Sequence, residues 1–380
     1  QQLKYALTQI DEARANESQE SREKRESKGW GELTNPRSIK PDGSLELVVS
    51  KDWTSGFFPG ELWYLYEYTH NPYWKEQAQK HTEILEREKN NGKTHDMGFK
   101  MYCSFGNGYR LTQDERYKEI LLQSARTLST RFKPKAGIIR SWDHNKDKWQ
   151  CPVIIDNMMN LELLFWATKE SKDSTYYNIA VSHARTTMKN HFRADYSCYH
   201  VIDYDTITGQ VLKKNTHQGL AHESAWARGQ AWALYGYTMC YRETKLPEFL
   251  EQAKKVEQYL FTHKNMPEDL IPYWDFDAPG IPNEPRDASA ATVIASALYE
   301  LSQYDRKNSE RYKKNADRIV ENLTNSYRTT LNKDNGFLLL HSTGTKPTNV
   351  EVDVPIVYAD YYFIEALLRK DKLEKTGKLF

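Results

Sequence analysis

The chain has 380 residues, and its 53 basic and 52 acidic side chains nearly cancel. This balance argues against nucleic acid or an anionic membrane as the main partner, because both need a concentrated positive surface. No stretch is long and apolar enough to span a bilayer. Aromatic residues make up 13% of the chain, with 10 Trp and 25 Tyr. Such residues are suited to stacking on flat or ring-shaped ligands.

The cysteines and the first residue are the sequence features that relate to the cellular compartment of the protein. Cys103, Cys151, Cys198 and Cys240 are far apart, and no pair has the spacing of a zinc or redox motif. Buried free thiols are expected, with a disulfide as the alternative. Gln1 in place of Met is compatible with a mature protein exported to a bacterial periplasm, and also with an artificial start of a cytoplasmic chain. Both readings stay open.

Residues 1–50 are predicted to form an N-terminal helix and an extended segment. Leu3, Leu7 and Ile10 recur at helical spacing, and a charged stretch follows them. Residues 41–43, Pro-Asp-Gly, indicate a turn before a short strand or extended segment over residues 45–49.

From residue 52 onward, two kinds of helix alternate. The first kind is apolar nearly all round, which places it in an interior. The second kind is charged on one side and carries an aromatic residue with a small or apolar residue four positions later. These pairs are Trp74/Ala78, Tyr117/Leu121, Tyr176/Ala180, Phe249/Ala253 and Tyr312/Ala316.

Six inner and six outer helices that alternate along the chain close most simply into an (α/α)6 barrel. We therefore predict an all-α fold with a single domain over residues 1–380. The inner helices of such a barrel are parallel, so their starts lie at one mouth and surround a central cavity. The starts are expected near Asp52, Asp96, Asp156, Ser224, Asp287 and Asp353.

Asp156 follows two isoleucines and opens an amphipathic run. A carboxyl in this apolar setting is expected to be partly desolvated, which raises its pKa, and a protonated acid near neutral pH is what a general acid needs. The alternative is an N-cap that binds the first-turn N–H groups. Repeated capping is also the alternative for Asp52, Asp287 and Asp353. Acids interleaved with tryptophans at one mouth favour a carbohydrate site.

Seven sequence pieces stand out between residues 50 and 365. They are DWTSGFFPG at 52–60, HDMGF at 95–99, IDNMMN at 155–160, HVIDYDTITG at 200–209, HQG at 217–219, WARGQAW at 226–232 and RDASAA at 286–291. Together, and in this order, they resemble the unsaturated glucuronyl hydrolases of glycoside hydrolase family 88. The predicted barrel is that family's fold.

The resemblance implies a hydrolase that removes a 4,5-unsaturated uronic acid from the non-reducing end of lyase-generated oligosaccharides, glycosaminoglycan disaccharides foremost. Ordinary glycosidases place two carboxylates around the anomeric carbon. This family instead hydrates the double bond: an acid protonates carbon 4, water adds at carbon 5, and the resulting hemiketal rearranges so that the glycosidic bond breaks. No metal, other cofactor or covalent intermediate is implied.

The matching motifs also imply roles for individual residues. Asp156 is the general acid and then the base that activates water. Asp96 is the second essential carboxylate, which binds ring hydroxyls and keeps Asp156 protonated by like-charge coupling. The residues expected to contact substrate are Trp53, His95, Trp142, His200, Gln218, Arg228 and Trp232.

Some of these assignments have alternatives. Arg228 and Trp232 are four residues apart on one helix face, where they would meet the uronate carboxylate or the next sugar. Core packing is the alternative for Trp232, and an ordinary hydrogen-bonded histidine is the alternative for His95. In some family members a loop near residues 341–347 accepts a sulfate. Ser342 and Lys346, with Thr345 between them, are the candidates here, and a plain surface loop is the alternative.

Three other functions compete with this reading. The related family 105 enzymes hydrate pectin-derived substrates on the same fold, although HDMGF and WARGQAW favour family 88. A non-catalytic sugar-binding toroid would keep the tryptophans without needing an apolar pocket around Asp156. An ordinary inverting glycosidase would need two carboxylates about 6.5–9.5 Å apart across a saturated substrate.

Overall fold

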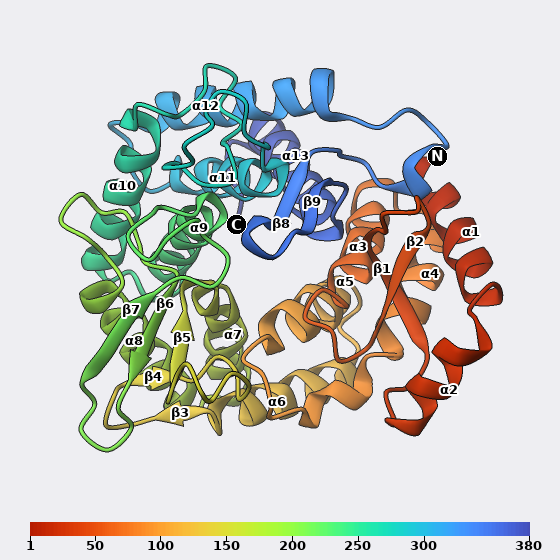
Figure 1. Ribbon diagram of the computed structural model, residues 1–380, viewed down its shortest axis with the longest axis horizontal. Coiled ribbons are helices and arrows are strands. Elements are labelled where there is room, and N and C mark those ends of the chain that lie inside the picture. Colours follow the sequence, from red (N-terminus) through yellow and green to blue (C-terminus); the bar gives the residue numbers. More distant parts are fainter.

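The computed structural model describes residues 1–380 as a closed ring of helices (Figure 1). Each inner segment packs against the next, and the last packs against the first, which confirms the predicted (α/α)6 barrel. The inner segments are α3 (Phe57–Thr69), η2 with α5 (Gly98–Gly106 and Asn107–Thr112), η3 with α7 (Ile155–Asn160 and Leu161–Ser171), α9 (Ala227–Thr244), α11 (Ala288–Leu301) and α13 (Val357–Thr376).

Five outer helices follow the inner ones along the chain, as the sequence predicts. They are α4 (Pro72–Glu83), α6 (Glu115–Ser129), α8 (Ser174–Asn190), α10 (Pro247–Thr262) and α12 (Ser309–Asn322). The N-terminal helix α1 (Gln2–Ala15) takes the sixth outer position, and α2 (Gln19–Ser27) follows it. Leu3 and Ala6 of α1 line a small cavity together with Phe58 of α3 and Val357 of α13. The start of the chain therefore completes the ring beside its end.

Short antiparallel strands occupy the connections that precede the inner helices. The expected segment over residues 45–49 is a strand, but the other strands were not predicted, so the mouth of the barrel is not purely helical. The pairs are β1 (Leu33–Ile39) with β2 (Leu45–Val49), β3 (Phe132–Lys133) with β4 (Ile138–Ile139), β5 (Pro152–Ile154) with β6 (Val201–Tyr204), β6 with β7 (Val211–Asn215), and β8 (Ser342–Thr345) with β9 (Val350–Val354).

Burial explains the two helix classes. The inner helix α11 is buried along its whole length, whereas the outer helix α12 buries only one stripe that includes Tyr312, Ala316 and Ile319. Inner helices also approach closely, since a Cβ on Gly236 of α9 would lie 2.5 Å from Met158.

All four cysteines are free thiols, and three of them are buried. None of the helices combines the length and apolarity needed to cross a bilayer.

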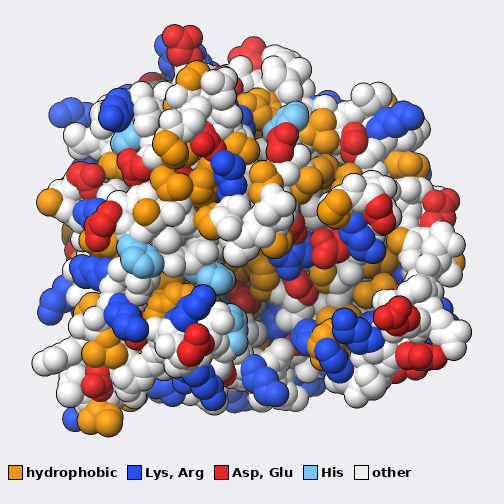
Figure 2. Space-filling view, in the orientation of Figure 1, with side chains coloured by type: hydrophobic (Ala, Val, Ile, Leu, Met, Phe, Trp, Pro, Cys, Tyr) orange, Lys and Arg blue, Asp and Glu red, His pale blue; other side chains and the backbone are white.

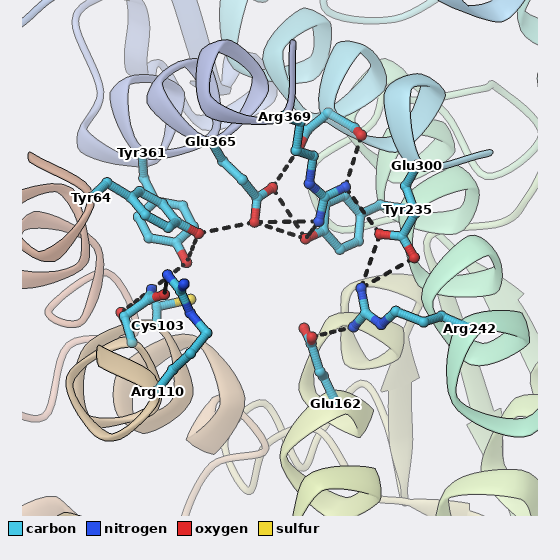
Figure 3. A network of polar contacts seen from close by, with 12 residues as sticks. Tyr64, Cys103, Arg110, Glu162, Tyr235, Arg242, Glu300, Tyr361, Glu365 and Arg369 are labelled. Carbon is cyan, nitrogen blue, oxygen red and sulfur yellow. Dashed lines mark hydrogen bonds and ion pairs between the residues drawn. The ribbon is translucent and has the colours of Figure 1, made fainter. Parts of the chain in front are cut away.

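Charged side chains join the inner helices at the barrel end away from their starts (Figure 3). Arg242 of α9 donates to Glu300 of α11 at 2.9 Å and to Glu162 of α7. Arg369 of α13 pairs with the same Glu300 at 3.0 Å and donates to the Tyr235 hydroxyl at 2.8 Å. Buried charges are tolerated because each has an opposite partner. The network ties four inner helices together.

Candidate active site

Asp96 precedes η2 and Asp156 lies in the first turn of η3, and these neighbouring inner segments touch each other. The Phe99 N–H of η2 donates to Asn160 Oδ1 of η3 at 3.0 Å. A Cβ on Gly98 would lie 2.6 Å from the Asn160 Cα, so only glycine permits this approach. The two acids consequently lie at one mouth of the barrel, as predicted. Figure 2 shows this face hollowed at its centre, with histidine side chains at the edge of the hollow.

The Asp156 carboxyl is not a helix cap. It is only 7% exposed, yet it accepts no hydrogen bond from the first turn of η3. Its Oδ2 has no hydrogen-bond partner in the protein. Burial raises the pKa of Asp156 to about 6, against the opposing influence of His95 and Arg228. This carboxyl therefore holds a proton at far higher pH than an ordinary aspartate.

His200 faces Asp156 with its own unpaired nitrogen. The His200 Nδ1 accepts the backbone N–H groups of His217 and Gln218, each at 3.1 Å. Burial, with a contribution from His217, holds the pKa of His200 well below its usual value, so the ring is neutral and its proton is on Nε2. That Nε2 lies 3.6 Å from Asp156 Oδ2, which is too far for a hydrogen bond, and has no other partner. Two buried unpaired polar atoms facing each other indicate a place for a polar ligand.

Asp96 differs from Asp156 in its environment. Its Oδ1 lies 3.1 Å from His95 Nε2, and its Oδ2 accepts the Thr94 hydroxyl. Burial alone would raise the pKa of Asp96, but the attraction of His95 and the hydrogen bonds from His95 and Thr94 outweigh it and lower the pKa. The Asp96 charge adds only a minor contribution to the raised pKa of Asp156, for which burial is the main cause. Asp156 therefore keeps part of its proton up to about pH 6, where Asp96 is already ionised, and such a separation of pKa values suits acid–base catalysis.

Two of the predicted tryptophans flank the acids. Trp142 pairs with Thr94 through the backbone, which brings it beside Asp96, and its buried indole N–H has no partner. Trp53 is partly exposed, and its ring lies 4.9 Å from the Tyr358 ring. Tyr358 was not predicted as a site residue, although its place in the first turn of α13, at the sixth helix start, was an available signal.

Arg228 is held by protein groups. Its Nη1 donates to Asp287 Oδ2 at 2.8 Å and to the Thr343 carbonyl at 2.6 Å, and its Nη2 donates to the Gly344 carbonyl at 2.8 Å. The Gln218 side chain donates to the same Gly344 carbonyl at 3.2 Å. Arg228 therefore anchors β8 to the mouth of the barrel. Its Nε–H and one Nη2–H have no partner in the protein.

Trp232 is a core residue, which is the alternative given for it above. It is completely buried, and its ring lies 5.3 Å from Phe99 and 5.5 Å from Tyr362. Only its indole N–H is left without a partner. An inner helix that is buried all round cannot expose a tryptophan face at this depth.

The predicted sulfate-binding loop belongs to the β8–β9 hairpin, and its charged side chains already have partners in the protein. Ser342 is buried in β8, and its hydroxyl has no partner. The Lys346 ammonium lies 2.7 Å from Glu284 Oε2 and 5.4 Å from the centre of the Trp274 ring. Its charge is therefore already neutralised by an acid.

Only one of the remaining acids predicted at helix starts caps a helix. Asp287 accepts the Ser289 N–H at 3.1 Å and caps α11, which is the alternative given for it. Asp52 does not cap a helix, because α3 begins only at Phe57: its side chain accepts the Thr54 N–H at 2.9 Å in the preceding turn and pairs with Arg37. Asp353 was placed wrongly, because it is an exposed residue of β9 that contacts His341 at 2.7 Å, and α13 begins only at Val357.

The family model for Glycosyl Hydrolase Family 88 matches residues 16–372. The chain belongs to this family. It is 52% identical over 347 residues to an unsaturated glucuronyl hydrolase of Formosa agariphila, covering 91% of this chain and 86% of that protein. It is a glycoside hydrolase, and the family match goes against the family 105 alternative.

Solved structures of the family share the whole fold. A heparin-specific unsaturated glucuronyl hydrolase superposes with a TM-score of 0.90 at 46% identity, over 98% of this chain and 97% of that one. A mutant unsaturated glucuronyl hydrolase from Streptococcus agalactiae, complexed with dGlcA-GalNAc6S, superposes with a TM-score of 0.77 at 28% identity, over 97% and 90% of the two chains.

The difference between the pKa values of Asp156 and Asp96 predicts the pH dependence of catalysis. We expect kcat/KM to fall as the pH rises through about 6, because the pKa of Asp156 lies there and only the protonated form can deliver a proton. At lower pH the Asp156 proton stays in place, so a loss of activity there would report protonation of Asp96. The measurement is kcat/KM against pH with a lyase-generated disaccharide. A profile that is flat on both sides of that value would contradict the assignment.

Proposed function

We propose that this family 88 hydrolase releases the 4,5-unsaturated uronate from sulfated glycosaminoglycan oligosaccharides by hydrating its double bond. One observation carries the mechanism: the buried carboxyl of Asp156, whose Oδ2 has no partner and whose pKa is raised to about 6, stands beside Asp96, whose pKa is lowered. A vinyl ether is protonated at carbon, so the reaction needs an acid whose proton is still present near neutral pH.

The steps follow from this arrangement. Asp156 transfers its proton to carbon 4, which leaves positive charge shared between carbon 5 and the ring oxygen. The resulting Asp156 carboxylate takes a proton from water as that water adds to carbon 5. The product is a hemiketal, which opens the ring and then releases the second sugar with its oxygen. The net change is the addition of one water molecule and the loss of one glycosidic bond.

Side chains beside Asp156 would orient the sugar ring of the unsaturated uronate. The His200 Nε2–H and the Trp142 N–H are buried donors without partners, so each can bind a hydroxyl or the uronate carboxylate. Asp96, held by His95 and Thr94, is an acceptor for ring hydroxyls. The free N–H groups of Arg228 would contribute from the floor of the site.

The substrate class is proposed from the relatives. The unsaturated glucuronyl hydrolase that is 46% identical to this chain is specific for heparin. The mutant enzyme that is 28% identical was solved in complex with dGlcA-GalNAc6S. We therefore place unsaturated heparin disaccharides first and chondroitin disaccharides second.

A panel of unsaturated disaccharides tests this proposal. Heparin, chondroitin, hyaluronan and pectin lyase products would be incubated with the protein, and loss of the ultraviolet absorbance of the conjugated double bond would be followed. We expect the highest kcat/KM with a heparin product and the lowest with the pectin product. Preference for the pectin product would contradict the substrate class, and absence of turnover on every substrate would contradict the reaction.

A further inference from the structure

A second hollow adjoins Asp96 on the side of the N-terminal segment. Its volume is about 570 Å³, and it shares Asp96 and Trp53 with the active site. Its far wall comes from α2, the β1–β2 hairpin and the residues that flank them, and includes Lys24, Trp30 and Lys51. Lys28 does not line the hollow itself but lies over the Trp30 ring that does. The hollow thus forms a groove that leads from the reacting centre to the outside.

Lysines without acidic partners surround Trp30. The ammonium groups of Lys51 and Lys28 lie 3.5 Å and 4.5 Å from the centre of the Trp30 ring. These two lysines and Lys24 form no ion pair. Burial and the nearby charge of Lys28 lower the pKa of Lys51, which fits two ammonium groups held close together.

Apart from the catalytic Asp96, the other charges in the groove are already neutralised. Arg25 lies 2.7 Å from Glu17, and Asp52 lies 2.9 Å from Arg37. The lysines therefore leave a net positive charge at the far wall. Figure 2 shows basic side chains gathered beside the central hollow on the side of α2 and the hairpin.

The groove can hold only one part of the substrate. An unsaturated uronate is a non-reducing chain end, so every further sugar is attached through its anomeric carbon. A groove that leaves the acid pair must therefore receive the sugar on the leaving side. This step depends on the proposed function.

We propose that Lys28 and Lys51, held over the Trp30 ring, bind a sulfate group on the sugar that leaves. The ring positions both ammonium groups through cation–π contacts, and the two positive charges held by one ring complement the negative charge of a sulfate ester. Lys346 is the competing candidate from the sequence, but its ammonium already contacts Glu284 at 2.7 Å.

The test compares matched disaccharides that differ only in sulfation of the second sugar. The double variant Lys28→Gln with Lys51→Gln should lower kcat/KM for the sulfated substrate about tenfold, mainly through a higher KM, because a remote ground-state contact is lost. The unsulfated substrate should change less than about twofold on the same reasoning. The wild-type preference for sulfate should also weaken in high salt, because partly exposed charges are screened.

Three single variants of the same chain complete the experiment. Lys314→Gln removes an exposed, unpaired lysine from the outer helix α12 and should leave both substrates unaffected. Trp30→Leu keeps both lysines but should reproduce part of the loss, because they are no longer held together. Lys346→Gln should affect both substrates equally.

Each other outcome overturns the proposal. Equal losses on both substrates in the double variant would show that the lysines do not distinguish sulfate. A selective loss in Lys346→Gln alone would move the sulfate to the β8–β9 hairpin. A loss on an unsulfated tetrasaccharide, but not on the sulfated disaccharide, would assign the groove to an internal uronate. Failure of the wild type to turn over any of these substrates would instead refute the proposed function.

Discussion

Replacing Asp156 with asparagine is expected to lower kcat by about 10³-fold, within the range for loss of a general acid. The amide has nearly the shape of the carboxyl but cannot supply the proton that carbon 4 needs. Substrate should still bind, because His200, Asp96 and the tryptophans are unchanged. Loss of ultraviolet absorbance measures the reaction, and calorimetric titration with the disaccharide measures binding.

This variant also separates catalysis from capping. Asparagine is as good an N-cap as aspartate, so a residue that only capped η3 would tolerate the change. The matched control is Asp173→Asn, which alters a true cap whose side chain accepts the Thr175 N–H at 2.8 Å on the outer helix α8. We expect normal activity from that control. Normal activity from the Asp156 variant would remove this residue from the mechanism.

Replacing Arg228 with leucine is expected to lower the free energy of unfolding by about 3–5 kcal/mol, as for other broken buried ion pairs. Arg228 and Asp287 have side chains that are 1% and 0% exposed, so the change leaves an uncompensated buried carboxylate. It also frees two carbonyls of β8, which should loosen the hairpin at the mouth and reduce activity. Chemical denaturation followed by circular dichroism measures the stability.

Two controls make the result specific. Arg185→Leu removes an exposed pair with Glu248 on the outside of the barrel and should cost about 0–1 kcal/mol. Adding Asp287→Asn to Arg228→Leu removes the stranded charge but keeps an oxygen for the Ser289 N–H, so part of the stability should return. Unchanged stability with a raised KM would show instead that Arg228 serves mainly to bind substrate.

The barrel could be predicted because its elements are encoded locally. Whether a helix is apolar all round or on one stripe is determined by neighbouring residues, and this property separates α11 from α12. The apolar approach to Asp156 was likewise visible in the chain, and burial is the main cause of its raised pKa. Both acids lie at the starts of inner segments, so their meeting at one mouth followed from the alternation of helices.

Only the tertiary structure decided which distant groups neutralise each other. The residues near Arg228 in the sequence do not predict its ion pair with Asp287, 59 residues away. The residues near Lys346 likewise do not predict its ion pair with Glu284. Such pairs form where the folded ring brings segments that are distant in sequence together. The sequence by itself therefore determined the helical classes, the family and the acid pair. The closed ring decided which polar groups remain free for a ligand, because a side chain is available only where no other part of the chain already satisfies it.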